Sequence, residues 1–185
     1  MYRKQKLFLI LMVVILVQTA CGTGPSAQET PMPTPNACPT ETADLKLYTN
    51  AQDGYCLLYP AAYALREPRF IVINPTNAPG DSLGDAWVDM TVEPASGRTA
   101  AQVADEAIAA VGPGFNITRT ETPVDNAQAI IVDGLPGQDS SRMVFVVSHN
   151  RLYVLTFLPW YPTADKSSPL EGLFDVIMNS LKFVG

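Results

Sequence analysis

The chain has 185 residues, which is enough for one domain of ordinary size with a substantial core but not for two such domains. It carries 12 Lys and Arg against 18 Asp and Glu, and three of the cations lie in the first 20 residues, so the remainder has a net charge of 9 minus 18, or −9. A surface with that excess of negative charge repels phosphate backbones and anionic lipid headgroups, which disfavours nucleic-acid binding.

Residues 1–20 have the organisation of an export signal. Three cations precede an apolar run at 7–17, and small residues end the segment before Cys21. The run has about 11 residues, whereas a transmembrane helix needs about 20, so the pattern predicts a cleaved leader rather than a permanent span. The residues before Cys21 resemble the lipobox of bacterial lipoproteins, with Gln18 standing where an aliphatic residue is usual.

This resemblance implies that Cys21 is the lipid attachment site and that its lipid, palmitate included, anchors the chain at the extracytoplasmic face of the cell membrane. The alternative is ordinary signal-peptide cleavage near Ala20, which leaves Cys21 as a plain thiol. Residues 21–44 are rich in Pro, Thr, Gly and Glu and contain few large apolar side chains. Because such a segment buries too little surface to offset its ordering entropy, we expect a disordered tether, with the folded domain at 45–185.

The three cysteines of an exported chain divide into one lipid site and one pair. We therefore expect a disulfide between Cys38 and Cys56, which closes a loop of about 18 residues and stabilises the fold by about 3 kcal/mol in the chain-entropy model. The alternative is two free thiols, with Cys56 simply buried. Two cysteines and one distant histidine do not have a recognisable zinc spacing, so no metal site is predicted.

Residues 142–160 predict a hairpin at the centre of the folded domain. The runs 144–147 and 152–158 are apolar at nearly every position, and turn-compatible side chains at 148–151 separate them. A strand that is apolar on both faces must be covered on both faces. The sequence therefore predicts an α+β fold in which a mainly antiparallel sheet is flanked by a helix on each face, as an α/β/α sandwich.

The other predicted elements surround this hairpin. Alternation of apolar and polar residues predicts a half-exposed strand at 86–93, and the helices are marked by capping signals and apolar stripes. Thr99 and Gln102 form a capping-box pair for the first helix, and Ser168 is the expected cap of the second. The expected strands are 45–48, 55–59, 69–74, 86–93, 115–124 and 128–132, and the expected helices are 99–111 and 169–183.

The start of the folded domain resembles the PsbP-like family. Tyr-Thr-Asn at 48–50, Asp-Gly-Tyr at 53–55 and Tyr-Pro at 59–60 are similar to the short strand, Gly-aromatic turn and strand ending in Tyr-Pro of that family, which usually continues with Trp where this chain has Ala-Ala-Tyr at 61–63. The resemblance covers residues 45–185 in the order of elements. It implies the α/β/α sandwich and, since members of the family mostly bind proteins or support assemblies, a non-enzymatic role.

Candidate sites are few. The sequence has one histidine, His149, and no G-x-S-x-G motif, so His149 is interpreted as a turn residue rather than a catalytic base. Asp81, Asp85, Asp89 and Glu93 lack the spacing of a calcium loop and are interpreted as the wet face of a strand. Trp87 and Tyr153 are interpreted as core or rim residues.

Trp160 and Tyr161 are the candidate partner-binding residues, because they lie between two prolines after the hairpin, where a partly exposed aromatic platform could bind a partner. The alternative for these two residues is also packing in the core or at its rim. No catalytic residue, metal or cofactor is predicted. The expected function is a lipid-anchored module that binds a protein of the cell envelope. The alternative is an exported hydrolase or small-ligand-binding enzyme whose site is assembled from Asp and Ser residues.

Overall fold

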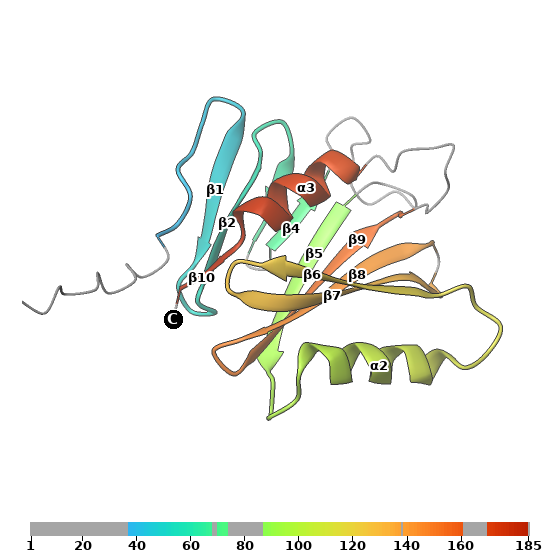
Figure 1. The fold of residues 1–185 in the computed structure, drawn as a ribbon. Coiled ribbons are helices and arrows are strands. Elements are labelled where there is room, and N and C mark those ends of the chain that lie inside the picture. Colours follow the sequence, from blue (N-terminus) through green and yellow to red (C-terminus); the bar gives the residue numbers. More distant parts are fainter. Residues whose placement is uncertain (1–36, 68–69, 74–86, 138, 161–169, 185) are drawn as a thin grey trace, which may run out of the picture. The chain divides into compact units, whose positions relative to one another are not determined.

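The computed structural model describes residues 37–67, 70–73, 87–137, 139–160 and 170–184, which form an α+β fold (Figure 1). Its strands are β1 (Leu45–Asn50), β2 (Tyr55–Pro60), β3 (Ala64–Arg66), β4 (Phe70–Ile73), β5 (Trp87–Pro94), β6 (Thr118–Val124), β7 (Ala127–Leu135), β8 (Ser141–Ser148), β9 (Arg151–Leu158) and β10 (Lys182–Phe183). Its helices are α2 (Ala100–Val111) and α3 (Glu171–Ser180).

The larger sheet has seven antiparallel strands in the order β3-β4-β5-β9-β8-β7-β6. The predicted hairpin is β8 and β9, and β9 is the middle strand. The turn between them has two residues, His149 and Asn150, with φ of 48° and 60°, as a type I′ turn requires. The right-handed twist of the strands favours that turn, so the local sequence and the sheet agree.

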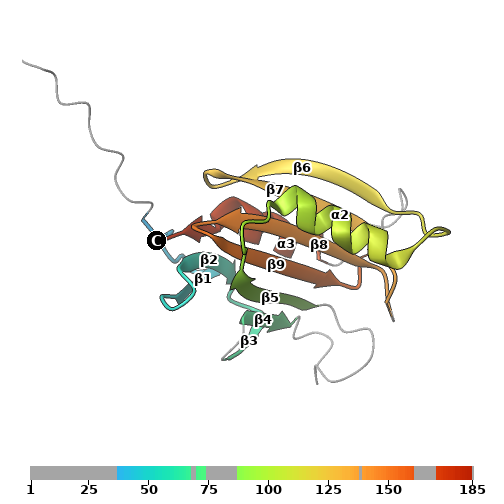
Figure 2. The same ribbon diagram turned by 90° about the horizontal axis from the view of Figure 1, so that it is seen from below.

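The two helices cover opposite faces of this sheet, as predicted. Along β8, Val144 and Val146 lie in the core cluster that contains Leu173 and Ile177 of α3. Phe145, between them, lies in the cluster that contains the buried residues of α2. Figure 2 shows α2 and α3 on the two sides of the sheet. The alternation of one strand between two cores confirms the α/β/α sandwich.

A second sheet, which the sequence did not predict as a separate element, lies on the α3 side. Strands β1, β2 and β10 form it, in the order β1-β2-β10. Alternate residues of β2, which are Tyr55, Leu57 and Tyr59, join the core of the larger sheet, and the Tyr55 ring packs edge-on against Tyr153 at 5.9 Å between centroids. The face covered by α3 is therefore also covered by this small sheet.

The C-terminal segment differs from its prediction. Helix α3 begins at Glu171 with Leu170 at the N-cap position and no side-chain capping bond, and the predicted cap at Ser168 lies outside the described residues. The helix ends at Ser180, and the next residues turn away from it to pair with β2 as β10. Leu181 has extended backbone angles, and Phe183 is buried beside Tyr153, so tertiary packing overrides the helical continuation.

Candidate functional site

The connection from β5 to α2 gathers the charged residues of the candidate site. Ala95 is buried, and its N–H donates a hydrogen bond to the carbonyl of Asn150 at 2.9 Å, which fixes the connection beside the β8–β9 turn. Ser96 and Gly97 then take left-handed φ angles of 54° and 78°. These two angles reverse the chain so that Arg98 precedes the helix and points back across it.

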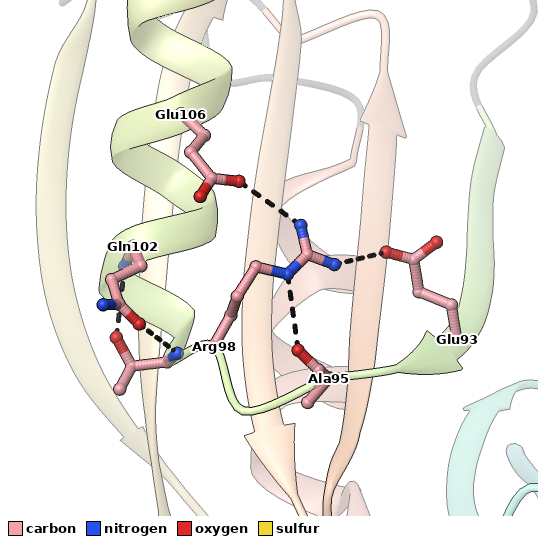
Figure 3. A network of polar contacts seen from close by, with 6 residues as sticks. Glu93, Ala95, Arg98, Gln102 and Glu106 are labelled. Carbon is pink, nitrogen blue, oxygen red and sulfur yellow. Dashed lines mark hydrogen bonds and ion pairs between the residues drawn. The ribbon is translucent and has the colours of Figure 1, made fainter.

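Arg98 joins the strand to the helix (Figure 3). One terminal nitrogen lies 3.2 Å from the carboxylate of Glu93 on β5, the other lies 3.3 Å from that of Glu106 on α2, and Nε donates to the Ala95 carbonyl at 3.3 Å. One guanidinium thus faces two carboxylates, which leaves one excess negative charge. Exposed pairs of this kind contribute at most about 1 kcal/mol each, so their main effect is to fix positions.

The helix start beside Arg98 is rigid because its capping box is complete, as predicted. Thr99 Oγ1 accepts a hydrogen bond from the Gln102 N–H at 3.2 Å, and Gln102 Oε1 accepts one from the Thr99 N–H at 2.8 Å. Two of the N–H groups that a helix start leaves unsatisfied are therefore bonded. The backbone around the site is held before any ligand arrives.

A surface pocket of about 370–450 Å³ opens on each side of this connection. The larger, about 450 Å³, is lined by Arg98, Thr99, Ala100, Ala101, Glu121, Gln128, Ile130 and Val147. Its floor is apolar, with Ile130 fully buried beneath it, and its rim is polar and charged. An apolar floor with a few polar groups at the rim suits a small amphipathic group such as a side chain of a partner protein. We call this the α2 pocket.

The smaller pocket, about 370 Å³, lies at the β8–β9 turn and includes His149, Asp53, Glu93 and Arg151. Arg151 and Asp53 form an ion pair at 3.2 Å. His149 is exposed, and its Nδ1 lies 3.1 Å from the hydroxyl of its sequence neighbour Ser148. The left-handed backbone places His149 at the tip of the turn, in agreement with its interpretation as a turn residue.

Trp160 packs in the core, which confirms the alternative stated for it, and it is not part of a partly exposed aromatic platform. Its side chain is 5% exposed and packs against Phe157 and Phe174, with ring centroids 6.4 and 5.5 Å away. The Arg142 guanidinium lies 3.8 Å from the centre of the Trp160 ring and covers it. Tyr161, the other residue of the predicted platform, lies outside the described residues.

The remaining aromatic candidates are partly or wholly covered. Trp87 is half-buried. Tyr153 is 1% exposed, and its hydroxyl donates to the Asp53 carbonyl at 2.8 Å. Burial raises the pKa of both Tyr153 and Tyr55 above the ordinary value of 10.0, so both phenols stay protonated at neutral pH. These tyrosines are therefore core residues with a bonded polar end rather than proton donors at a site.

Buried acids and serines, which the alternative hydrolase would use, have structural partners. Asp133 accepts two hydrogen bonds from Arg142, at 2.8 and 2.7 Å, and Asp125 forms an ion pair with Lys182 at 3.0 Å. The buried hydroxyl of Ser180 donates to the Val176 carbonyl at 2.6 Å and accepts from the Leu58 N–H at 2.9 Å. None of these contacts joins a serine to an acid.

The acidic string also separates into unlike environments. Asp89 is half-buried on β5 and Glu93 is exposed and bonded to Arg98, while Asp81 and Asp85 lie outside the described residues. Within the described ranges no three His, Cys, Asp or Glu side chains are grouped so that they could hold a metal ion. Val88 and Met90, the apolar residues of the same strand, are buried as predicted.

Cys38 and Cys56 form the predicted disulfide, with their Cα atoms 5.7 Å apart. Cys21 lies outside the described residues. In the part of the chain that the structure describes, no helix has the length and hydropathy of a membrane span.

Sequence reasoning did not find the α2 pocket or the three contacts of Arg98. The capping-box pair was the only signal of a fixed helix start there, and nothing local indicates that Glu93, Glu106 and Arg98 meet. The pocket walls come from β6, β7 and β8 as well as α2, so their proximity depends on strand order.

Comparison with known proteins gives a likeness of structure only. No protein-family model matches the sequence, and no curated protein matches it. Among solved structures, the chain is similar to the solution structure of cyanobacterial PsbP (CyanoP) from Synechocystis sp. PCC 6803. The identity is 16%, the likeness covers 80% of this chain and 98% of the other, and the TM-score is 0.44. The likeness is one of fold, the PsbP-like fold that the sequence resembles.

Proposed function

We propose that the chain is an exported lipoprotein, anchored by a lipid on Cys21, whose domain binds a protein partner and is not an enzyme. The observation that supports export is the disulfide between Cys38 and Cys56. Such bonds persist in oxidising compartments outside the cytosol and are rare within it. Together with the basic and apolar leader, the bond favours an extracytoplasmic location for the domain.

The binding role is supported by the α2 pocket. Its helix start is capped, its Arg98 is held by two carboxylates, and its floor is formed by side chains of the sheet, so the surface is fixed before binding. A preformed pocket needs less ordering on association than a flexible one. We propose that it receives one apolar side chain of an envelope protein, with the charged rim bonding to the backbone around that side chain.

The anchor is tested by comparing the chain with its Cys21→Ser variant in a bacterial host. We expect the parent chain in the membrane fraction, with a mature mass that exceeds the polypeptide mass by an acylated glyceride, and the variant released to the soluble envelope fraction. An unmodified Cys21, or the same distribution for both chains, rules out the lipid anchor.

The binding surface is tested with two arginine substitutions on the same helix. Ala101→Arg fills the α2 pocket, whereas Ala110→Arg places the same side chain on an exposed position of α2 outside it. Envelope proteins crosslinked to the domain are identified for both variants and for the parent chain. We expect one partner to be lost with Ala101→Arg and retained with Ala110→Arg. Equal retention by both variants rejects the pocket as the binding site.

A further inference from the structure

Residues 38–44, here called the strap, lie along the open edge of β1. Strand β1 is an edge strand of the small sheet and pairs only with β2 among the described strands, so alternate backbone groups face away from that partner. Figure 1 shows the chain running beside β1 before it turns back into the strand. The strap is the last part of residues 21–44, for which the composition predicts a disordered tether. Unlike that prediction, the strap has a defined position, because its last residues bond to β1.

The strap bonds to the groups that a pairing strand would use. Thr42 and Leu45 exchange two hydrogen bonds, from the Leu45 N–H to Thr42 Oγ1 at 3.1 Å and from the Thr42 N–H to the Leu45 carbonyl at 3.0 Å. The Leu47 N–H donates to the carboxylate of Glu41 at 2.8 Å. Since an uncovered row of such groups pairs readily with another chain, the strap acts as a cover for the edge.

The disulfide holds this cover in place. Cys38, at the start of the strap, is bonded to Cys56, whose partner in the β1–β2 register is Thr49. The bonds from Thr42 and Glu41 to β1 are solvent-exposed, and exposed hydrogen bonds of this number do not offset the entropy lost by ordering seven residues. The strap therefore stays on the edge because the disulfide fixes its first residue and so restricts the conformations that it can adopt away from β1.

We propose that the edge of β1 is a self-association site and that the strap is its removable cover: when the disulfide is reduced, β1 pairs with β1 of a second copy. Antiparallel pairing centred on Leu47 sets the outward backbone groups of the two strands opposite each other. It places Leu45 opposite Thr49, and Lys46 opposite Tyr48. Lys46 is the only charged residue of β1, so this register puts no like charges opposite each other, which favours a second copy as the occupant.

Reduction needs a dithiol. One thiolate of the dithiol attacks the sulfur of Cys38, because Cys38 is half-buried whereas Cys56 is fully buried. A bond forms to that sulfur, the disulfide bond breaks, and Cys56 leaves as a thiolate that takes up a proton. The second thiol of the dithiol then displaces Cys38. Two electrons pass to the protein, and the products are two cysteine thiols and the disulfide of the reductant.

The inference is tested with the chain from residue 21 onward carrying Cys21→Ser, so that Cys38 and Cys56 are the only thiols. Its mass is measured by light scattering after size exclusion, with and without dithiothreitol, beside the variant Cys38→Ser/Cys56→Ser. We expect a single-copy mass for the bridged chain and a twofold mass for the reduced chain and for the bridge-free variant. A single-copy mass for a folded bridge-free chain overturns the proposal.

The matched control is Thr49→Pro in the bridge-free chain. The backbone N–H groups of Leu45 and Leu47 bond to the strap, so the N–H of Thr49, two residues further along, also points away from β2. Proline at this position removes that N–H, which spares the β1–β2 hydrogen bonds but blocks pairing at the free edge. We expect it to restore the single-copy mass, and a persistent twofold mass rejects the β1 edge.

If circular dichroism shows that the bridge-free chain is unfolded, the bridged variant Glu41→Ala/Thr42→Ala takes its place. It removes the side-chain acceptors of the Leu45 and Leu47 N–H groups, leaves the backbone bond from residue 42 to the Leu45 carbonyl, and keeps the disulfide. At low protein concentration we expect faster hydrogen exchange at the Leu47 amide, and as the concentration rises we expect a mass that approaches twofold. A single-copy mass at all concentrations, with the Leu47 amide exchanging freely, overturns the proposal.

Discussion

Substitution of Gly54 by alanine tests whether Val184, which follows β10, packs against the β1–β2 turn as the structure shows. Gly54 has a φ of 69°, and a Cβ added to it would lie 2.8 Å from the carbonyl oxygen of Val184. The Val184 N–H in turn donates to the Gly54 carbonyl at 2.9 Å. A side chain at this position therefore lowers the free energy of unfolding in two ways: it is strained by the left-handed backbone, and it displaces the chain after β10.

Gly97→Ala separates these costs because Gly97 has a φ of 78° and nothing within 4 Å of an added Cβ. A left-handed φ costs an L residue about 1–2 kcal/mol, and the reduced freedom of the unfolded chain returns about 0.4–1 kcal/mol, so Gly97→Ala should lose about 1 kcal/mol. Gly54→Ala also weakens the Val184 hydrogen bond, worth about 0.5–1.5 kcal/mol, for a total of about 2 kcal/mol. Urea unfolding measures both losses of stability, provided that the dependence of the free energy of unfolding on urea concentration is unchanged. Equal losses would refute the close approach of Val184.

Three other outcomes are expected. Ser180→Ala leaves the buried Leu58 N–H without its acceptor and should reduce the free energy of unfolding by about 1–3 kcal/mol in urea. Reduction of the Cys38–Cys56 bond should lower it by about 3 kcal/mol, and a loss under 1 kcal/mol would contradict the entropy estimate. Burial raises the pKa of Tyr55 in the folded chain above its value in the unfolded chain, so the protonated phenol contributes its full stability to the fold below pH 10 and loses it as the pH rises further. Tyr55→Phe should therefore reduce the fall of the thermal midpoint with pH above pH 10. The same fall in the parent chain and the variant would contradict this expectation.

The parts of the fold that the sequence predicts are those governed by neighbouring residues. The apolar runs of β8 and β9, the turn at His149 and the capping box at Thr99 each depend on a few consecutive side chains, and the structure confirms them. The small sheet depends on contacts between distant residues. Lys182 pairs with Cys56, and Ser180 bonds to Leu58 across 122 positions, so no local pattern separates these residues from a longer helix.

The candidate site shows the same division. Trp160 follows a strand and lies beside prolines, which is typical of an exposed corner. The backbone N–H of Trp160, however, donates a hydrogen bond to the Ser140 carbonyl at 2.6 Å, and the guanidinium of Arg142 covers the Trp160 ring. Arg142 is fixed by Asp133, its direct neighbour in the β7–β8 register. The burial of Trp160 therefore depends on a strand register that the residues around it do not specify.

Both ends of the described domain are fastened to β2. The strap is joined to it through the sulfur of Cys56, and β10 pairs with Cys56 and Tyr55 before Val184 bonds back to Gly54. Cys56 is fully buried, whereas Cys38 and Val184, which attach the two ends, are half-buried. Fraying of one end exposes the strand that holds the other, and the two ends should therefore open together. Hydrogen exchange at the Val184 amide would show this coupling, because reduction of the disulfide should speed it, whereas an unchanged rate would mean that the two ends are independent.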